Sequence, residues 1–244
     1  MTTLLSAQHL RCSYGARVVF DDVCLDVPGG RLISLIGPNG SGKSSLLRML
    51  AGLQPAQGGA LHASGSRMLI VPSAQPPADL TPWDLAGYGL AVRRKPWEWG
   101  LPPLAQARVA AALERCGLSA QAHQPVTTLS AGEIQRAWVA AALAVEADVL
   151  LIDEPTTHLD LRYQMDVLRT LRVLTRSGIA VITALHDLTL AARLADEIAL
   201  LADGSLRSGS AADVMTASGI GRAFGIDVTI HRHPEEGYLI CEPV

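Results

Sequence analysis

The sequence predicts an α/β fold built on a mostly parallel sheet, with an N-terminal antiparallel β subdomain and an inserted helical subdomain. Three observations lead to this prediction. Apolar runs at Leu32–Ile36, Val149–Ile152 and Ile179–Ile182 have the length and composition of buried parallel strands. Strand-like alternation dominates the chain before the first run, and helical patterns fill most of 76–124 before the second.

Residues from about Leu4 to Ile33 are expected to form the antiparallel subdomain. Arg17–Phe20 and Val23–Val27 alternate as strands do, and turns are expected at Gly15 and at Pro28–Gly30. This subdomain should flank the ligand site that is expected at the next part of the chain, a glycine-rich loop.

A glycine-rich loop follows the first buried strand and precedes a helical pattern. This order is typical of a phosphate-binding loop, in which backbone N–H groups and a helix N-terminus surround a phosphate. Lys43 is expected to reach the β- and γ-phosphates of a nucleoside triphosphate, and the Ser44 hydroxyl to bind Mg²⁺. The alternative is a plain glycine turn. The residues expected to bind the nucleotide here are Gly37, Pro38, Asn39, Gly40, Ser41, Gly42, Lys43, Ser44 and Ser45.

The inserted helical part contains two helix starts. Thr81 and Pro82 begin one helix, and two prolines precede a second over Leu104–Cys116. Between them, a positively charged segment carries Trp97 and Trp99. Contact with a partner or membrane surface and simple local packing are both open for this segment.

Ser130 and Glu133 have the spacing of a capping box that opens a helix over Ile134–Val145. A well-capped helix is the simple interpretation. The same helix start also presents N–H groups and positive potential, which suit the γ-phosphate of a nucleotide held by another molecule.

Two carboxylates, Asp153 and Glu154, end the second buried strand. Open α/β sheets hold ligands at the carboxyl ends of their strands, so both are expected near the phosphate loop. We expect Asp153 to hold Mg²⁺ through water and Glu154 to polarise the water that attacks the γ-phosphate. A strand end capped by solvated acids is the alternative.

Leu129–Arg136, with the sequence Leu-Ser-Ala-Gly-Glu-Ile-Gln-Arg, resembles the signature motif of ATP-binding cassette (ABC) proteins. Ala131 stands where the family has glycine. The resemblance implies that Ser130 and Gly132 contact the γ-phosphate of ATP bound by a second copy, so that two copies sandwich two ATP molecules.

Other positions match this family residue by residue. The resemblance implies that Tyr14 stacks on adenine, that His186 contacts the γ-phosphate, and that Asp160 lies in a loop linking the two active sites. From the residues alone, a core or turn position explains Tyr14 better than a contact with adenine does. Asp160 is also a candidate N-cap for a helix over Leu161–Leu174, and a lone histidine is usually structural.

Family members also carry a glutamine after a strand, here Met68–Val71, that senses Mg²⁺. We expect Gln75 in this catalytic and metal-binding role, although the usual spacing points to Ser73.

Composition sets limits on these predictions. A chain of 244 residues with 49% hydrophobic content can bury a full core, and its net charge of −3 gives no reason to expect nucleic acid. No apolar run approaches the roughly 18 residues of a membrane span, and no leader peptide is seen, so a cytosolic chain is expected. Without close-pair spacing, the four cysteines indicate neither a zinc site nor disulfides. His231 and His233 suggest a solvated strand face rather than a metal site.

Three further segments narrow the resemblance: Asp153–Asp160, Leu185–Leu188 and Ala223–Asp227. They are similar to subunits that power import of iron-siderophores, haem or cobalamin. The implied protein is one ABC ATPase domain using ATP and Mg²⁺, with a core at about 1–75 and 146–244 and a helical subdomain at about 76–145. It would lie peripherally on the cytoplasmic face of the inner membrane. Its implied partners are membrane-spanning permease subunits, a second copy of itself and, indirectly, a substrate-binding protein.

Three alternatives remain. An ABC transporter ATPase for another substrate, or a soluble ABC ATPase of DNA repair or translation, would use the same catalytic residues. The soluble proteins commonly carry a second cassette or a long coiled-coil insertion, which the sequence does not show. A phosphotransferase would leave Ser130–Arg136 without an explanation.

Overall fold

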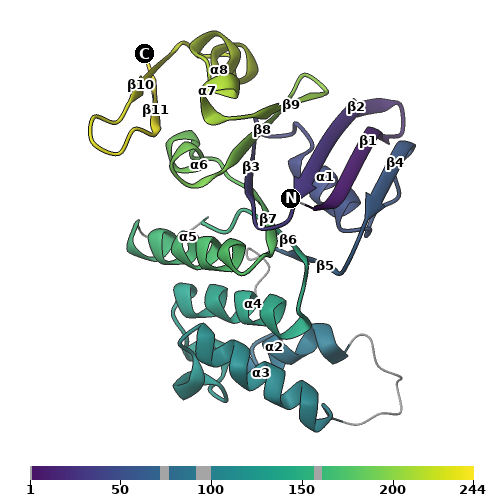
Figure 1. The fold of residues 1–244 in the computed structure, drawn as a ribbon, viewed down its shortest axis with the longest axis vertical. Coiled ribbons are helices and arrows are strands. Elements are labelled where there is room, and N and C mark those ends of the chain that lie inside the picture. The colour runs from purple at the N-terminus through teal and green to yellow at the C-terminus, as the bar shows by residue number, and fades with distance from the viewer. Residues whose placement is uncertain (1, 72–76, 92–99, 157–160) are drawn as a thin grey trace. The chain divides into compact units, whose positions relative to one another are not determined.

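The computed structural model describes residues 2–71, 77–91, 100–156 and 161–244 (Figure 1). The chain divides into two compact units. One, called the sheet unit below, comprises Met1–Leu69, Asp148–Glu154 and Leu171–Val244. The other, called the helical unit, comprises Ile70–Ala147 and Pro155–Thr170.

A six-stranded sheet with the order β5-β6-β7-β3-β8-β9 forms the centre of the sheet unit. β3 pairs in parallel with both β7 and β8, and β6 pairs in parallel with β7, whereas β9 is antiparallel to β8. Every residue of β3 and β7 is buried, as expected of central strands covered on both faces. The strands are β3 (Leu32–Ile36), β5 (Arg67–Ile70), β6 (Val149–Asp153), β7 (Ala180–Ala184), β8 (Glu197–Ala202) and β9 (Ser205–Gly209).

A three-stranded antiparallel sheet, ordered β2-β1-β4, confirms the predicted N-terminal β subdomain. It consists of β1 (Thr3–Tyr14), β2 (Arg17–Pro28) and β4 (Gly58–Ala63). The sequence predicted two separate strands where the structure has the single strand β2. The reason is an irregularity in the β1–β2 pairing around Asp21 and Asp22, which interrupts the apolar alternation without ending the strand.

The helices of the sheet unit connect and cover these strands. α1 (Lys43–Leu50) follows β3, and α6 (Leu188–Leu194) follows β7. The C-terminal part of the chain forms two short helices and a hairpin in which β10 pairs antiparallel with β11. Its elements are α7 (Ala211–Val214), α8 (Ala217–Phe224), β10 (Val228–Arg232) and β11 (Leu239–Pro243).

The helical unit is built from α2 (Pro82–Ala91), α3 (Pro103–Arg115) and α4 (Ala131–Val145), which lie side by side in Figure 1. Two short 3₁₀ turns, η1 (Ser119–Gln121) and η2 (Val126–Thr128), join α3 to α4. α5 (Leu161–Arg176) begins in this unit and ends in the sheet unit. The predicted start of α4 at Ile134 is three residues late, because a serine N-cap places the first helical residue directly after itself.

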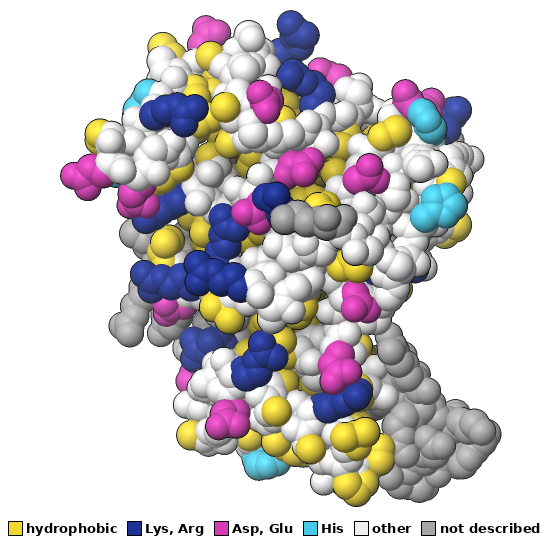
Figure 2. Space-filling model, in the orientation of Figure 1, with side chains coloured by type: hydrophobic (Ala, Val, Ile, Leu, Met, Phe, Trp, Pro, Cys, Tyr) yellow, Lys and Arg dark blue, Asp and Glu magenta, His cyan; other side chains and the backbone are white. Residues whose placement is uncertain are grey.

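None of the described helices is long and apolar enough to cross a membrane. On the face drawn in Figure 2, acidic and basic side chains are interspersed over most of the surface. Several predicted residues fall outside the described part of the chain: Ser73, Gln75, Trp97, Trp99 and Asp160.

Candidate nucleotide site

The glycine-rich loop joins β3 to α1 and packs closely against neighbouring strands. A Cβ atom on Gly37 would lie 2.1 Å from the carbonyl oxygen of Leu201 in β8, and one on Gly42 would lie 2.5 Å from Cγ1 of Val19 in β2. Both glycines have positive φ, 152° and 103°, which other residues rarely adopt. The two positions therefore require glycine both for space and for backbone conformation.

The N-terminus of α1 is open to an anion. Its N-cap is Gly42, which offers no side-chain cap, and the first helical hydrogen bond runs from Leu46 N–H to Gly42 O at 2.8 Å. The N–H groups before Leu46 have no acceptor within the helix. The buried Ser41 Oγ also has no hydrogen-bond partner among the described residues. These donors at the positive end of a helix fit a bound phosphate.

Lys43 brings a buried cation into this loop. Its Nζ donates to Gly37 O at 2.8 Å and to Pro38 O at 3.0 Å, and the residue is 7% exposed. Burial lowers the pKa of Lys43, while the negative charges of Glu154 and Asp153 act in the opposite direction and raise it. The loop, the lysine and the two carboxylates therefore belong to one electrostatic cluster.

Asp153, the last residue of β6, has an unsatisfied oxygen. Its Oδ1 is buried without a hydrogen-bond partner in the described part of the chain. A buried carboxylate oxygen without a partner is costly, and Mg²⁺ takes such hard oxygen ligands together with hydroxyls. Ser44, in the first turn of α1, offers such a hydroxyl. The residues present thus fit Mg²⁺ held by Asp153 and Ser44.

Glu154 and His186 form a pair at the carboxyl edge of the sheet. β6 and β7 are neighbours, with Asp153 opposite Ala184, so the residues after the two strand ends meet. Glu154 Oε1 lies 2.6 Å from His186 Nε2, and the side chains are 33% and 45% exposed. Glu154 also has a φ of +56°, a conformation that a glutamate rarely adopts and that often marks functional sites. A carboxylate held in this way is suited to accept a proton from water.

Tyr14, at the end of β1, lies beside α1. Its hydroxyl forms hydrogen bonds with Ser45 Oγ at 3.0 Å and Gln54 Oε1 at 3.2 Å, and the residue is 53% exposed. Because its ring is exposed, Tyr14 does not occupy a core position. Its hydroxyl is hydrogen-bonded to Ser45 in the first turn of α1, the helix that begins at the phosphate loop.

In the helical unit, Ser130 caps α4 with the predicted capping box. Ser130 Oγ accepts from Glu133 N–H at 3.3 Å and donates to Glu133 Oε2 at 2.7 Å, while Ser130 N–H donates to the same oxygen at 2.8 Å. These bonds from Ser130 lower the pKa of Glu133. Gln121 Nε2 donates a hydrogen bond to the other carboxylate oxygen of Glu133, Oε1, at 3.3 Å. Gly132 is buried in the first turn of α4.

Two glutamines to which the sequence analysis gave no role support the chain just after Glu154. Gln135, on the buried face of α4, donates its Nε2 to Pro155 O, and Gln164 Nε2 donates to Thr156 O at 3.3 Å. Both bonds lie within the helical unit. A buried glutamine one turn after a capping serine is a usable sequence signal, because buried amides must find partners.

The structure places the predicted residues in two groups. Most of them lie in the sheet unit: the phosphate loop with Lys43, Ser44 and Ser45, and with them Tyr14, Asp153, Glu154 and His186. Ser130 and Gly132 lie in the helical unit. The predictions for Gln75 or Ser73 and for Asp160 concern residues outside the described ranges.

Comparison with known proteins identifies one family. The family model described as ABC transporter matches residues 20–157, which is more than half of the chain. The matched span contains the phosphate loop, the Ser130 capping box and the two carboxylates at the end of β6.

Curated relatives match along nearly the whole chain. The hemin import ATP-binding protein HmuV of Thermobifida fusca is 38% identical, over 100% of this chain and 89% of the relative. The iron(3+)-hydroxamate import ATP-binding protein FhuC of Bacillus subtilis is 34% identical, over 97% and 93%. The ferric enterobactin transport ATP-binding protein FepC of Escherichia coli is 32% identical, over 98% and 94%.

Solved structures share the fold. One, described as an inward-facing conformation of a metal-chelate type ABC transporter, has a TM-score of 0.90 at 24% identity and covers 100% of this chain and 98% of its own. The ADP conformation of MJ1267, an ATP-binding cassette of an ABC transporter, has a TM-score of 0.79 at 20% identity, covering 88% and 95%. At these identities the likeness concerns the fold alone.

Proposed function

The chain belongs to the ABC transporter family, and we propose that it is the ATP-hydrolysing subunit of an importer whose cargo is an iron chelate, either an iron-siderophore or haem. The observation that carries the proposal is the arrangement at one edge of the sheet. There the phosphate loop with buried Lys43 shares an electrostatic cluster with Asp153 and Glu154, and Glu154 is hydrogen-bonded to His186.

In the proposed reaction, the open N-terminus of α1 and the Lys43 ammonium bind the phosphates of ATP. Glu154 accepts a hydrogen bond from the attacking water, and His186 orients the Glu154 carboxylate and contacts the γ-phosphate. When bound by Asp153 and Ser44, Mg²⁺ neutralises charge on the phosphate oxygens. Tyr14 presents its exposed ring to the adenine. Gln75 is proposed to contribute to the metal site as well.

We further propose that a second copy of the chain completes each site. In this dimer Ser130 and Gly132 of one copy face the γ-phosphate held by the other, and Asp160 links the two sites. ATP stabilises the closed dimer because both copies contact it, and hydrolysis removes that stabilisation. Permease subunits in the membrane would convert closing and opening into transport.

The cargo is inferred from the relatives. Their printed names refer to hemin, iron(3+)-hydroxamate and ferric enterobactin, all of which are iron chelates. We further propose that the chain lies at the cytoplasmic face of the inner membrane, bound to a permease that receives its cargo from a substrate-binding protein. Cobalamin, which the sequence resemblance included, is the cargo to test against these chelates.

Similarity to import and transport ATP-binding proteins over at least 97% of the chain favours this function over a soluble ABC ATPase of DNA repair or translation. A phosphotransferase remains disfavoured, because it would leave the Ser130 capping box without a chemical role.

The test is affinity purification from gently solubilised membranes of the native host, followed by mass spectrometry. We expect a polytopic permease to co-purify, and we expect the Lys43→Ala variant to retain it, since Lys43 is proposed to bind the nucleotide and not the permease. Reproducible recovery of soluble proteins or nucleic acid alone would contradict the importer proposal. Adding the substrate-binding protein loaded with an iron-siderophore, haem or cobalamin should then show which cargo stimulates ATP hydrolysis by the purified complex.

A further inference from the structure

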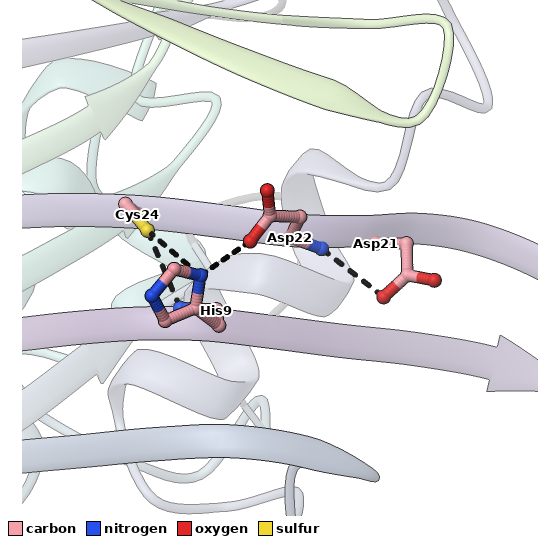
Figure 3. Close-up of polar contacts among 4 residues, drawn as sticks. All are labelled: His9, Asp21, Asp22 and Cys24. Carbon is pink, nitrogen blue, oxygen red and sulfur yellow. Dashed lines mark hydrogen bonds and ion pairs between the residues drawn. The ribbon is translucent and has the colours of Figure 1, made fainter.

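Three side chains that commonly bind metals meet on the exposed side of the antiparallel sheet, within the sheet unit. His9 lies on β1, and Asp22 and Cys24 lie on the adjacent strand β2 (Figure 3). In the described part of the chain, this is the only group of three or more His, Cys, Asp or Glu residues whose ligand atoms approach one another closely enough to share an ion. Figure 2 also shows histidine and acidic side chains together on the surface over this sheet.

The separation of the His9 and Cys24 ligand atoms is close to that of a tetrahedral site, whereas the Asp22 oxygen lies closer to His9. His9 Nδ1 is 3.8 Å from Cys24 Sγ and in hydrogen-bond contact with Asp22 Oδ1, and all three atoms lie within 4.8 Å of one another. With metal–ligand bonds of about 2.0–2.3 Å, ligand atoms in a tetrahedral site stand about 3.5 Å apart. A modest outward movement of the Asp22 carboxylate would make room for the ion. We propose that His9, Asp22 and Cys24 bind a divalent transition-metal ion of the Zn²⁺ type.

The backbone holds these side chains in an unusual way. Between the pairs Ala7–Leu25 and Leu10–Val23, β1 carries one extra residue, and between Leu10–Val23 and Cys12–Phe20, β2 carries one. His9 and Asp22 fall in these two bulges, with φ of +54° and +61°. Such values are uncommon for residues other than glycine, and bulges often redirect a side chain at a functional site.

A neighbouring strand is shaped to accept the bulge at His9. Gly59 of β4 has a φ of +80°, and a Cβ atom there would lie 2.3 Å from the carbonyl oxygens of both Gln8 and His9. The bulge is therefore built into the packing of the three-stranded sheet. A site on such paired strands is more precisely held than one on a loop.

Groups around the three ligands also support metal binding. The His9 backbone N–H donates a hydrogen bond to Cys24 Sγ at 3.3 Å. Asp22 N–H donates to Asp21 Oδ1 at 3.1 Å, and Asp21 lies 3.6 Å from Arg11. Of these contacts, the one to Cys24 Sγ reaches a ligand atom directly, and contacts of that kind orient metal ligands and raise their affinity.

The donor set defines the ion. One thiolate, one imidazole nitrogen and one carboxylate suit Zn²⁺ and related transition metals, whereas Mg²⁺ and Ca²⁺ prefer oxygen alone. Three protein ligands leave a fourth position for water or for a group from a partner.

Cys24 can be distinguished from the other cysteines. Burial raises the pKa of Cys12 and Cys241 and raises the pKa of Cys116 to about 11, so these three are poor thiolate donors. A thiolate–metal signal from the native protein should therefore report Cys24.

The test uses the full-length, nucleotide-free protein in the presence of Mg²⁺. Co²⁺, which replaces Zn²⁺ in tetrahedral sites and is coloured, is titrated while the near-ultraviolet thiolate-to-metal band is recorded. The affinity for Zn²⁺ is measured by competition with a chromophoric chelator. The variants are Cys24→Ser, His9→Asn and Asp22→Asn, since asparagine tolerates the left-handed backbone of the two bulges. Cys241→Ser and His62→Asn, the latter on β4 of the same sheet, are matched controls.

We expect one thiolate band, saturating at one Co²⁺ per chain, in the native protein and in both controls. Cys24→Ser should abolish it, and His9→Asn and Asp22→Asn should each weaken Zn²⁺ binding by at least about 10-fold. Zn²⁺ should also raise the Tm of the native protein, a readout that does not depend on any variant. Absence of the band from the native protein, its survival in Cys24→Ser, or native Zn²⁺ affinity in both asparagine variants would overturn the proposal.

Discussion

The chain presents two helix N-termini that are both expected to meet phosphate, and they are built differently. α1 begins after Gly42, without any side-chain cap, so its first N–H groups await an outside acceptor. α4 begins after Ser130, whose backbone N–H and hydroxyl are both engaged by Glu133. The helix dipole is the same in kind at both sites, but only the second N-terminus carries a side-chain cap from its own residues.

This difference assigns unequal tasks to the two units. The open terminus of α1, together with buried Lys43, should supply most of the affinity for ATP. At α4, a phosphate must share or displace hydrogen bonds that Ser130 already makes, so contact there adds less net binding energy. We therefore expect α4 to contribute to dimer closure and hydrolysis rather than to initial ATP binding.

The largest effect is expected from Glu154→Gln. It removes the base and keeps the shape of the side chain, so ATP hydrolysis should fall by about 10²- to 10⁴-fold while ATP binding is retained. The measurements are steady-state phosphate release and equilibrium ATP binding. Glu236→Gln, a surface glutamate paired with Arg193, is the control and should leave both unchanged. Normal turnover in Glu154→Gln would remove its assigned role.

Lys43→Ala should reduce ATP affinity by roughly 10- to 100-fold, because a charge-assisted contact to phosphate is lost from a buried position. Equilibrium binding of ATP to the variant and to the native protein measures this loss of affinity. Arg48→Ala removes an exposed cation from the last turn of the same helix and should not change the affinity. Undiminished affinity in Lys43→Ala would contradict the phosphate-loop assignment.

Ser130→Ala sharpens the comparison of the two helix starts, because Ser210 caps α7 with a similar Ser-x-x-Asp arrangement. Each alanine substitution should lower the free energy of unfolding by about 1 kcal/mol through loss of the cap. ATP affinity of the single chain should be nearly unchanged in both. Only Ser130→Ala should slow hydrolysis; equal turnover in the two variants would show that Ser130 is merely a cap.

The smallest expected effect is a shift in the pH dependence of ATP binding. Binding weakens as the pH rises through the pKa of Lys43, because the neutral amine no longer attracts phosphate. Glu154 raises the pKa of Lys43 against the lowering caused by burial, so Glu154→Gln should move this loss of binding to a lower pH. Affinity measured across alkaline pH tests this, with Glu236→Gln as a control that should show no shift.

The parts of the fold predicted from sequence are those fixed by local patterns. The strand, glycine loop and helix around Lys43, and the capping box at Ser130, each lie within a few consecutive residues, and both are present in the structure. Their nucleotide contacts remain predictions. The predicted α/β class and the ABC family are confirmed by the folds and families of related proteins.

Features that depend on pairing between distant segments were not predictable. β4 begins with two glycines and lacks a strong strand pattern, so it forms only through its pairing with β1. Cysteine spacing suggested no metal site, yet the register of β1 and β2 brings His9 to Cys24 across 15 positions. Likewise, the hydrogen bond from Gln135 to Pro155 joins residues that no local pattern connects.

In the proposed dimer, Ser130 of a second copy completes the site in which the phosphate loop binds ATP. The most direct measurement is the mass in solution of Glu154→Gln, determined by light scattering with saturating MgATP and with MgADP. We predict the mass of two chains with ATP and of one chain with ADP, and one chain with ATP when Ser130→Ala is added. A single-chain mass with ATP bound, or a two-chain mass unaffected by nucleotide and by Ser130→Ala, would rule out this ATP-dependent dimer.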